Sequence, residues 1–507
     1  MLLFEKINEV YFIVKPDTQA DFAELQELWY AFSLTHPEKN FMPKYKNGTW
    51  DGTVRFIRYI DKFKELALVP IGLFVDIFEF MLSHDIEFRV LDNDIGNIKV
   101  DLRGFDKWLL ENESDKSKKI SEREYQYEAV KHALSLNRCV MESPTGSGKS
   151  LMIYMYMKWI LDHYFDKDDK FLILVPTTDL VNQMTEDFVE YGCPRQAICK
   201  IYSGQKRDMS KPIIISTWQS LYKEDYDFFE QFTAIVFDEC HKSKADEQIY
   251  IGENCVNAKW RLATSATIQE DKVHRYSIMQ NFGDIFTTAT TRELIDSGYL
   301  CDFNVRNIIM EWKNTKGHFI KIEDNDYQKE YNAIINNEHR MEAMVNFICN
   351  LWVEREFDDS TIMVMGKRIS YIEDIFTRLS EKIDRVFFIH GQINPAERSK
   401  VKDYIKRKGG VLVANIDIMG TGINIPNVTT IVFANPIKSD ILLLQTIGRA
   451  IRLHAGKEVA TVYDIIDKMK LENSNYNTVY GWLPDKIKIY ETKNFKYDTI
   501  HVDLIHN

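Results

Sequence analysis

The chain contains 507 residues, too many for one compact core, so two to four domains are expected. Its net charge of -12 excludes a uniformly basic nucleic-acid binder, although local patches and backbone amides can still bind phosphate. The longest apolar runs, such as Phe171–Val175, are too short to cross a membrane, and Met1–Val10 contains no apolar signal core. We therefore expect a cytoplasmic protein with no membrane segment.

The cysteines are scattered, and no two have the close spacing of a zinc knuckle or an iron–sulfur loop. This pattern predicts buried free thiols rather than a metal centre. The seven are Cys139, Cys193, Cys199, Cys240, Cys255, Cys301 and Cys349.

The first 112 residues mix short strands with amphipathic helices, and the polar segment Glu111–Lys119 predicts a linker after them. We therefore expect residues 1–112 to form a small α+β domain. Between residues 40 and 64, six cations accompany two acids, and aromatic residues are interleaved with them. Such a composition suits nucleic-acid backbones and bases, so the predicted contacts are Lys44, Lys46, Trp50, Arg55 and Arg58. The alternative is a small sheet with an aromatic core and solvated lysines.

Beyond the linker, continuous apolar strands alternate with helical patterns, which predicts parallel sheets covered on both faces. One series comprises Cys139–Glu142, Phe171–Val175, Ile213–Ser216, Ala234–Phe237 and Arg261–Thr264. The second comprises Thr361–Met365, Arg385–Ile389, Gly410–Ala414, Thr430–Phe433 and Ala460–Asp464. We expect an α/β protein with two such domains, at residues 113–300 and 301–470. Residues 471–507 form either a docking tail or part of the second core.

The segment from Ser143 to Ser150, SPTGSGKS, follows a strand and opens a helix, as a phosphate-binding loop does. Gly146 and Gly148 allow the backbone to curl so that its N–H groups point inward. Lys149 places a cation on the outer phosphates, and the Ser150 hydroxyl can ligate Mg²⁺. The strict pattern has Gly where this chain has Ser143. The loop predicts ATP and Mg²⁺ as cofactors.

Asp238 and Glu239 end another buried strand, where two adjacent carboxylates are costly unless they serve a function. Asp238 can hold Mg²⁺ through water, while Glu239 can orient and deprotonate the attacking water. A solvated acidic turn is the alternative for the pair, and a hydrogen-bonded loop histidine is the alternative for His241.

Arg449 and Arg452 are three residues apart on a predicted helix and therefore share one face. An arginine from a second domain can complete an ATP site by offsetting charge in the transition state. The alternative is a solvated basic helix face.

In this order, the motifs resemble those of superfamily 2 helicases and translocases across residues 121–465. The resemblance implies two tandem RecA-like domains. It also implies roles for residues that spacing alone does not assign. Nucleotide contacts would be Gln126 on adenine, Thr145, Gly146, Ser147, Gly148, Lys149 and Ser150 on phosphates, and Gly422 and Gln445. Nucleic-acid contacts would be Thr177, Thr178, Thr217, Gly366 and Thr421, and coupling residues would be His241, Ser265 and Thr267.

One departure is Asn424, where relatives commonly carry an acidic residue; it weakens the expected nucleotide contact of that motif. The segment Phe41–Gly52, the motifs and the chain length further resemble the UvsW family of recombination and branch-migration helicases of large tailed phages. That resemblance implies action on forks, Holliday junctions and R-loops, with 3′-to-5′ travel, and recombination or replication proteins as partners. A monomer is favoured.

Other functions remain open from the residues alone. They are an RNA helicase, a double-strand DNA translocase subunit of a restriction or remodelling complex, and a non-enzymatic ATP-controlled clamp or annealing scaffold.

Overall fold

The computed structural model describes residues 1–506 except 93–94, 96–99, 109–122, 203–206, 243–244, 270, 323–326, 356–357, 417–424, 439–442, 444–445, 449–452, 455–456 and 473–474. The chain divides into two compact units: residues 1–143 with 148–289, and residues 144–147 with 290–507. Within the described ranges, no helix combines the length and apolarity that a membrane crossing requires. All seven cysteines are free thiols, and six of them are buried, as expected.

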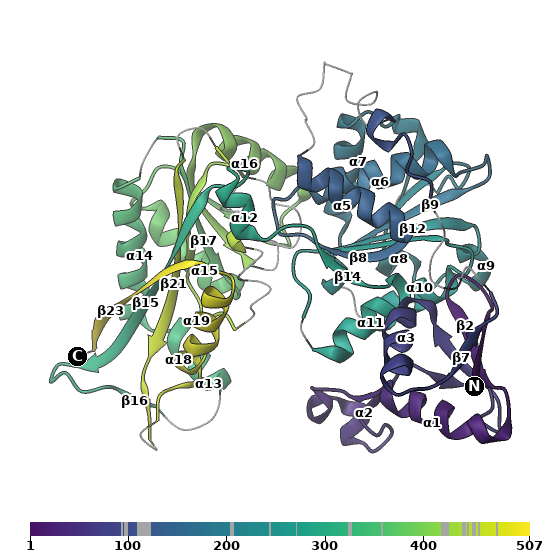
Figure 1. The fold of residues 1–507 in the computed structure, drawn as a ribbon. Helices are drawn as coiled ribbons and strands as arrows, with labels where there is room; N and C mark the ends of the chain where they lie inside the picture. The colour runs from purple at the N-terminus through teal and green to yellow at the C-terminus, as the bar shows by residue number, and fades with distance from the viewer. Residues whose placement is uncertain are drawn as a thin grey trace. The chain divides into compact units, whose positions relative to one another are not determined.

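The N-terminal region forms a five-stranded sheet in the order β5-β6-β2-β1-β7. Figure 1 shows this region in purple, with β2 and β7 labelled. Leu2 and Phe4 of β1 and Phe12 and Val14 of β2 alternate inward, which gives the sheet one buried face. Its strands are β1 (Leu2–Lys6), β2 (Tyr11–Pro16), β5 (Arg58–Tyr59), β6 (Ala67–Pro70) and β7 (Phe88–Val90). Beside them lie α1 (Phe22–Ala31), β3 (Ser33–Thr35), α2 (Pro43–Lys46), β4 (Thr53–Arg55) and α3 (Phe74–Ser83).

This N-terminal sheet packs tightly on helix α11 (Lys272–Phe282) of the same unit. The Phe32 ring stacks on Tyr276 with centroids 5.7 Å apart, and Tyr276 Oη donates to Asp76 at 2.8 Å. Gly72 approaches the helix so closely that a Cβ there would lie 1.9 Å from the Met279 carbonyl oxygen. The two parts therefore share one hydrophobic core.

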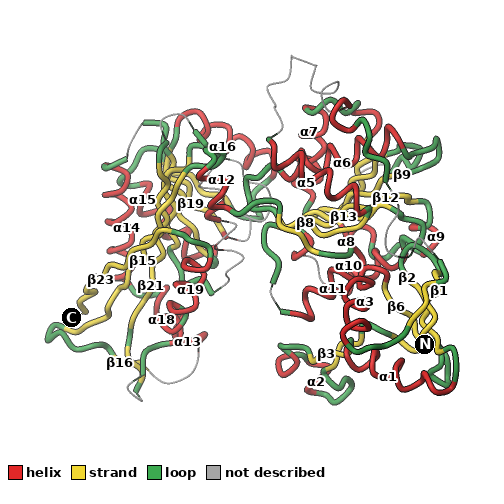
Figure 2. Tube along the Cα trace, viewed as in Figure 1, coloured by secondary structure: helices red, strands yellow, loops and turns green. Residues whose placement is uncertain are grey.

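The first unit also contains a seven-stranded sheet in the order β10-β11-β9-β12-β13-β8-β14, with every pair parallel. Figure 2 shows its strands in yellow with helices on both sides of them. Alternate residues of β9 belong to two separate cores, with Phe171 and Ile173 in one and Leu172 and Leu174 in the other, so both faces are covered. The strands are β8 (Arg138–Glu142), β9 (Lys170–Val175), β10 (Ile198–Ile201), β11 (Ile213–Thr217), β12 (Phe232–Asp238), β13 (Trp260–Ser265) and β14 (Ile285–Thr287). The other helices are α5 (Glu124–Leu136), α6 (Lys149–His163), α7 (Thr178–Glu190), α8 (Trp218–Leu221), α9 (Tyr226–Phe229) and α10 (Ala245–Asn254).

The second unit contains a seven-stranded parallel sheet in the order β18-β19-β17-β20-β21-β15-β23. Phe347 of α14 packs on Tyr463 of β21, whereas Lys486 of α19 pairs with the next residue, Asp464. Since successive strand residues point to opposite faces, α14 and α19 cover opposite faces (Figure 1). The strands are β15 (Asp302–Asn314), β17 (Thr361–Gly366), β18 (Val386–Ile389), β19 (Gly410–Asn415), β20 (Val428–Phe433), β21 (Val459–Lys468) and β23 (Lys496–His506). The helices are α12 (Thr291–Asp296), α13 (Tyr327–Ile335), α14 (Glu338–Val353), α15 (Ile369–Ser380), α16 (Pro395–Lys408), α18 (Thr478–Gly481) and α19 (Leu483–Thr492).

Two parallel sheets and a small N-terminal α+β sheet confirm the predicted fold class. Residues 471–507, for which two interpretations were open, contribute two helices and the edge strand β23 to the second unit. Strand β23 pairs with β15 from Lys496 to His506.

Candidate active site

The phosphate loop joins β8 to α6, as its sequence predicts. Gly146 and Gly148 have φ values of 87° and 82°, in the left-handed region that glycine tolerates. Gly148 directly precedes the first residue of the 15-residue helix α6. The N-terminal N–H groups of such a helix, with its dipole, favour bound phosphate.

Gln126, the predicted adenine contact, lies against this loop. Its side chain is buried, and its Oε1 accepts a hydrogen bond from the Arg123 amide at 2.9 Å. A Cβ on Gly148 would lie 2.4 Å from Gln126 Nε2, so the Gln126 amide lies directly against the loop backbone. Gln126 therefore belongs to the same site as the phosphate loop.

Lys149 and Glu239 come together although they are 90 residues apart in the chain. Lys149 Nζ lies 3.7 Å from Glu239 Oε1 and donates to the Ser143 carbonyl at 3.2 Å. Glu239 has a φ of 53°, a left-handed conformation that is uncommon for a residue with a side chain and is found at functional sites. The structure thus places the predicted phosphate-binding cation beside the predicted base.

Asp238 ends β12 and is buried. Its Oδ1 accepts hydrogen bonds from Thr264 Oγ1 at 2.6 Å and from the Glu239 amide at 2.9 Å. Burial, followed by repulsion from Glu239, raises the pKa of Asp238 to about 6, although Lys149 opposes the shift. A buried carboxyl of this kind is stabilised in its ionised form by a cation, which fits the predicted Mg²⁺ role.

Ser150, the other predicted metal ligand, exchanges a hydrogen bond with Tyr191 at 3.1 Å between the two hydroxyl oxygens. Burial raises the pKa of Tyr191 to about 12, so its phenol stays neutral at physiological pH. The sequence did not indicate Tyr191. It lies just after α7, in no recognisable motif, and only the packing of α7 on α6 brings it to Ser150.

The three predicted coupling residues form a connected chain. His241 Nδ1 lies 2.7 Å from Ser265 Oγ and 3.5 Å from Glu239 Oε2. Ser265 Oγ donates to the Thr267 carbonyl at 2.7 Å. These contacts connect the carboxylate beside the phosphate loop to the end of β13. His241 lies in a short 3₁₀ helix (Cys240–Lys242) and contacts both Ser265 and Glu239.

Three predicted nucleic-acid contacts lie at the carboxyl end of the seven-stranded sheet of the first unit. Thr177 caps α7 by accepting from the Leu180 amide at 3.3 Å. Thr178 begins that helix, and Thr217 ends β11 with its hydroxyl 2.8 Å from Ser220 Oγ. The carboxyl edge of a parallel sheet is where ligands bind in such folds.

Gly366 is the last residue of β17 in the second unit. A Cβ there would lie 2.2 Å from Ile372 and 2.6 Å from Asn435 Oδ1, so glycine is required. The backbone of the next residue, Lys367, is hydrogen-bonded at both its N–H and its carbonyl. Lys367 N donates to Asn435 Oδ1 at 3.1 Å, and Asn415 Nδ2 donates to the Lys367 carbonyl at 2.7 Å. Neither asparagine was indicated by the sequence, because both act across strands.

Several predicted site residues lie outside the described residues, so their roles remain predictions. They are Thr421, Gly422, Gln445, Arg449 and Arg452, together with Asn424.

The basic segment of the N-terminal region, residues 40–64, contains both exposed cations and cations paired within the chain. Lys44 and Lys46 are exposed on α2. Arg55 pairs with Asp51, while Arg58 pairs with Glu253 at 3.1 Å. Trp50 is half-buried and donates to the Thr53 carbonyl at 2.9 Å. Some side chains of this segment are therefore committed to the fold and others are exposed, and the predicted nucleic-acid contacts stay a prediction.

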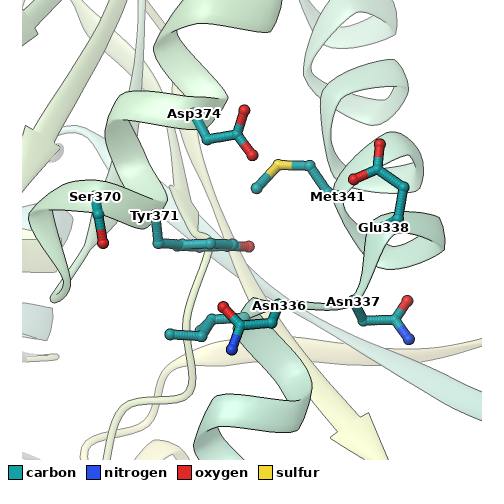
Figure 3. Close-up of a pocket in the computed structure, with 8 residues that line it drawn as sticks. Asn336, Asn337, Glu338, Met341, Ser370, Tyr371 and Asp374 are labelled. Atoms are coloured by element: carbon teal, nitrogen blue, oxygen red, sulfur yellow. The ribbon is translucent and has the colours of Figure 1, made fainter.

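A hollow of about 300 Å³ lies between the start of α14 and α15 in the second unit (Figure 3). Its two carboxylates, Glu338 and Asp374, both bind Arg378, at 2.9 and 3.0 Å. The Tyr371 hydroxyl contacts the buried Arg340. The charged groups of this hollow are therefore already paired within the chain, and it offers no charged ligand an obvious partner.

Comparison with known proteins gives the family. The model of the type III restriction enzyme res subunit matches residues 119–270, and that of the helicase conserved C-terminal domain matches residues 341–454. The ATP-dependent DNA helicase uvsW of Enterobacteria phage T4 is 30% identical over 501 residues, which cover 94% of this chain and 95% of that protein.

Two solved structures support the fold alone. The DEAD-box helicase Mss116 bound to ssRNA and UDP-BeF aligns with a TM-score of 0.55 at 16% identity, over 80% of this chain and 81% of its own. The type ISP restriction-modification enzyme LlaBIII bound to DNA aligns with a TM-score of 0.55 at 17% identity, over 83% of this chain and 34% of its own. Because the phage T4 helicase matches nearly the whole length of this protein at 30% identity, the chain belongs to the UvsW family of superfamily 2 helicases.

Proposed function

We propose that this protein is an ATP-dependent DNA helicase that remodels forks, Holliday junctions and R-loops in recombination, repair and recombination-dependent replication. The observation that carries the proposal is the chain of contacts from Lys149 through Glu239 and His241 to Ser265. It connects a phosphate-binding loop to the carboxyl end of β13. Action as a monomer in the cytoplasm of an infected host, alongside recombination and replication proteins, belongs to the same proposal.

The residues of the phosphate loop and of the strands and helices around it fit ATP. Gln126 would contact adenine, while Lys149 and the backbone amides from Gly146 to Ser150 would bind phosphates. Ser150 and Asp238 would hold Mg²⁺, which supplies charge neutralisation at the phosphates when bound. The raised pKa of Asp238 supports this assignment, because a nearby cation favours its ionised form.

Hydrolysis in this proposal depends on Glu239. Its carboxylate accepts a proton from the attacking water as the water oxygen bonds to the γ-phosphorus and the bond to ADP breaks. Arg449 and Arg452 would offset the charge that develops on the phosphates. Through His241, a change in the partners of Glu239 reaches Ser265 and hence the end of β13, which supports coupling of hydrolysis to movement.

DNA is proposed as the substrate because the phage T4 relative is described as a DNA helicase. The Mss116 structure, which contains ssRNA, shares the fold and so keeps an RNA substrate as the competing outcome.

A panel of nucleic acids tests the proposal. ATP hydrolysis is measured with single-stranded, duplex, forked and four-way DNA and with matched RNA, and strand separation is measured on the forked substrates. The expected result is the strongest stimulation by branched DNA, together with unwinding. Stronger stimulation by RNA would indicate an RNA helicase. Triplex displacement without unwinding would indicate a double-strand translocase, and absence of turnover would indicate an ATP-controlled clamp.

A further inference from the structure

A small projection extends from the second sheet, formed by residues 313–322, 468–472 and 475–482 and called here the β16–β22 projection. It is built on β16 (Lys321–Ile322) and β22 (Lys470–Leu471), which pair in parallel. Two further bridges close it, between Lys313 and Phe319 and between Lys470 and Tyr476. None of the predicted site residues lies in it.

Aromatic rings surround one lysine in this projection. Lys468 Nζ lies 5.2 Å from the ring centroid of Phe319, 4.8 Å from that of Tyr476 and 5.0 Å from that of Tyr480. The Tyr476 and Tyr480 centroids are 5.1 Å apart. Lys468 is buried and also pairs with Glu311 at 2.9 Å. The rings are therefore held in fixed positions around a cation.

Glu311 anchors this arrangement. Burial alone would raise its pKa, but hydrogen bonds from Lys313, Lys468 and His501 together lower the pKa of Glu311 to about 2. The carboxylate thus stays ionised and keeps Lys468 in place over the whole physiological pH range. The aromatic cluster is a rigid platform.

The outer surface of this platform is both aromatic and basic. Tyr476 is 42% exposed despite its contacts with neighbouring rings. Lys316 and Lys321 are exposed, and Lys470 lies half-buried over the Phe319 ring. Glu472 is the acidic side chain on the described part of this surface. Lysine is depleted from protein–protein interfaces, whereas lysines beside aromatic rings suit nucleic-acid backbones and bases.

The position of the projection also favours nucleic acid as its ligand. Met365 of β17 lies opposite Phe433 of β20, which lies opposite Asp464 of β21. Strand β21 continues four residues further, to Lys468, which at about 3.3 Å per residue extends it roughly 13 Å past the end of β20. All strands of the second sheet are parallel, so the projection stands at the carboxyl edge of the sheet, where Gly366, the predicted nucleic-acid contact, also lies. Figure 1 shows β16 at the end toward which the strands point.

We propose that the β16–β22 projection is a stacking surface for unpaired bases. Tyr476 stacks on a base released from the duplex, while Lys321 and Lys470 bind the adjoining phosphates, which hinders the separated strands from pairing again. This inference rests on the proposed helicase function and adds to it a site for the unpaired strand.

The opposite edge of the same sheet offers a matched control. Tyr404 of α16 is 40% exposed and has one ring neighbour, Phe387, at 5.2 Å. Helix α16 ends at Lys408, two residues before β19 begins, so its last turn lies at the amino edge of the sheet. Lys406 and Lys408 match Lys321 and Lys470 in charge.

The test uses the full chain and two measurements. The first is unwinding of a forked DNA, and the second is the fluorescence of 2-aminopurine at the first unpaired nucleotide, which stacking quenches. We expect Tyr476→Ala to lower the unwinding rate about tenfold and to abolish the quenching. Tyr476→Phe and Tyr404→Ala should stay within about twofold of the unchanged protein. The double variant Lys321→Ala/Lys470→Ala should weaken binding of the forked DNA several-fold, whereas Lys406→Ala/Lys408→Ala should not.

The outcomes separate this inference from the helicase proposal. If the unchanged protein hydrolyses ATP and unwinds DNA but Tyr476→Ala behaves like Tyr404→Ala in both measurements, the projection has no stacking role. If the unchanged protein neither unwinds nor hydrolyses ATP, the helicase proposal fails, while quenching by the protein without ATP still tests stacking. Should Tyr476→Ala lower the melting temperature, Tyr476→Leu fills the same space without an aromatic face and decides the question.

Discussion

Each of the two seven-stranded sheets contains a buried carboxylate, and the two carboxylates have different kinds of partner. Asp238, at the end of β12, is held by the neutral Thr264 hydroxyl and Glu239 amide, and its pKa is raised to about 6. Asp467, on β21, receives the guanidinium of the equally buried Arg340 at 2.7 Å. The first carboxylate is poised for a cation that the site would bind, whereas the second is already neutralised by the fold. Burial alone therefore does not distinguish a functional charge from a structural one, but the partner does.

The Arg340 network shows how complete that neutralisation is. Burial alone would lower the pKa of Arg340, but Asp467 and Tyr371 raise it well above its ordinary value. Arg340 also donates to the Ala434 carbonyl at 3.0 Å, and Trp312 Nε1 donates to Asp467 at 2.9 Å. Helices α14 and α15, strands β15 and β21 and the residue after β20 meet at this pair.

The largest effect is expected from Arg452, the arginine predicted to complete the ATP site. Arg452→Ala should spare ATP binding and lower the rate of ATP hydrolysis by about 10³–10⁵-fold, because charge in the transition state would be left without its counter-charge. Steady-state hydrolysis and equilibrium nucleotide binding measure the two parts. Arg407→Ala, on the exposed end of α16, is the control. A near-normal turnover rate for the Arg452 variant would remove this assignment and leave catalysis to the first sheet.

A smaller but still severe loss is expected at the first sheet. Glu239→Gln keeps the shape of the side chain but removes the base, so kcat should fall about 10²–10⁴-fold with little change in ATP affinity. Glu230→Gln, exposed at the end of α9, should have no effect. Equal activity in both variants would favour the alternative interpretation, in which the acidic pair is a solvated turn.

In the second sheet, removing the buried counter-charge should change the free energy of unfolding rather than the rate of ATP hydrolysis. Arg340→Leu leaves Asp467 buried without its counter-charge, and the free energy of unfolding should fall by about 3–5 kcal/mol in urea titrations. Arg378→Leu breaks the exposed pair with Glu338, which should cost only about 0–1 kcal/mol. If the two variants lose the same stability, the contrast between the sheets is wrong.

The smallest effect concerns the N-terminal region. Reversing the charge of Lys44 and Lys46 should weaken DNA binding and lower its salt dependence by about one unit for each lost phosphate contact. Arg55 and Arg58 are already paired, so reversing them should matter less. Lys167→Glu, an exposed residue of the same unit, is the control. Binding that is unchanged at low salt would assign this region a structural role.

The sequence predicted the parts whose signal is local. Buried strands such as β9 and β12 are continuous apolar runs, and the phosphate loop and acidic pair are short motifs, so all were predictable. Strand β23 was not predicted, because it lies at the edge with exposed side chains and its partner β15 is about 190 residues away. Tyr191, Asn415 and Asn435 were missed for a related reason: each acts through a long-range contact that leaves no spacing in the sequence.

The docking of the N-terminal sheet on α11 has a mechanical consequence. Helix α11 begins five residues after Thr267, and its Tyr276 and Met279 sit inside the N-terminal core. Among the described residues, the small sheet thus shares one core and one compact unit with the ATP-binding sheet, so we expect the two to move together. A duplex bound by Lys44 and Lys46 would therefore move whenever the ATP-binding sheet moves. The distance between that sheet and the two lysines would then set how far the duplex moves in each ATP cycle.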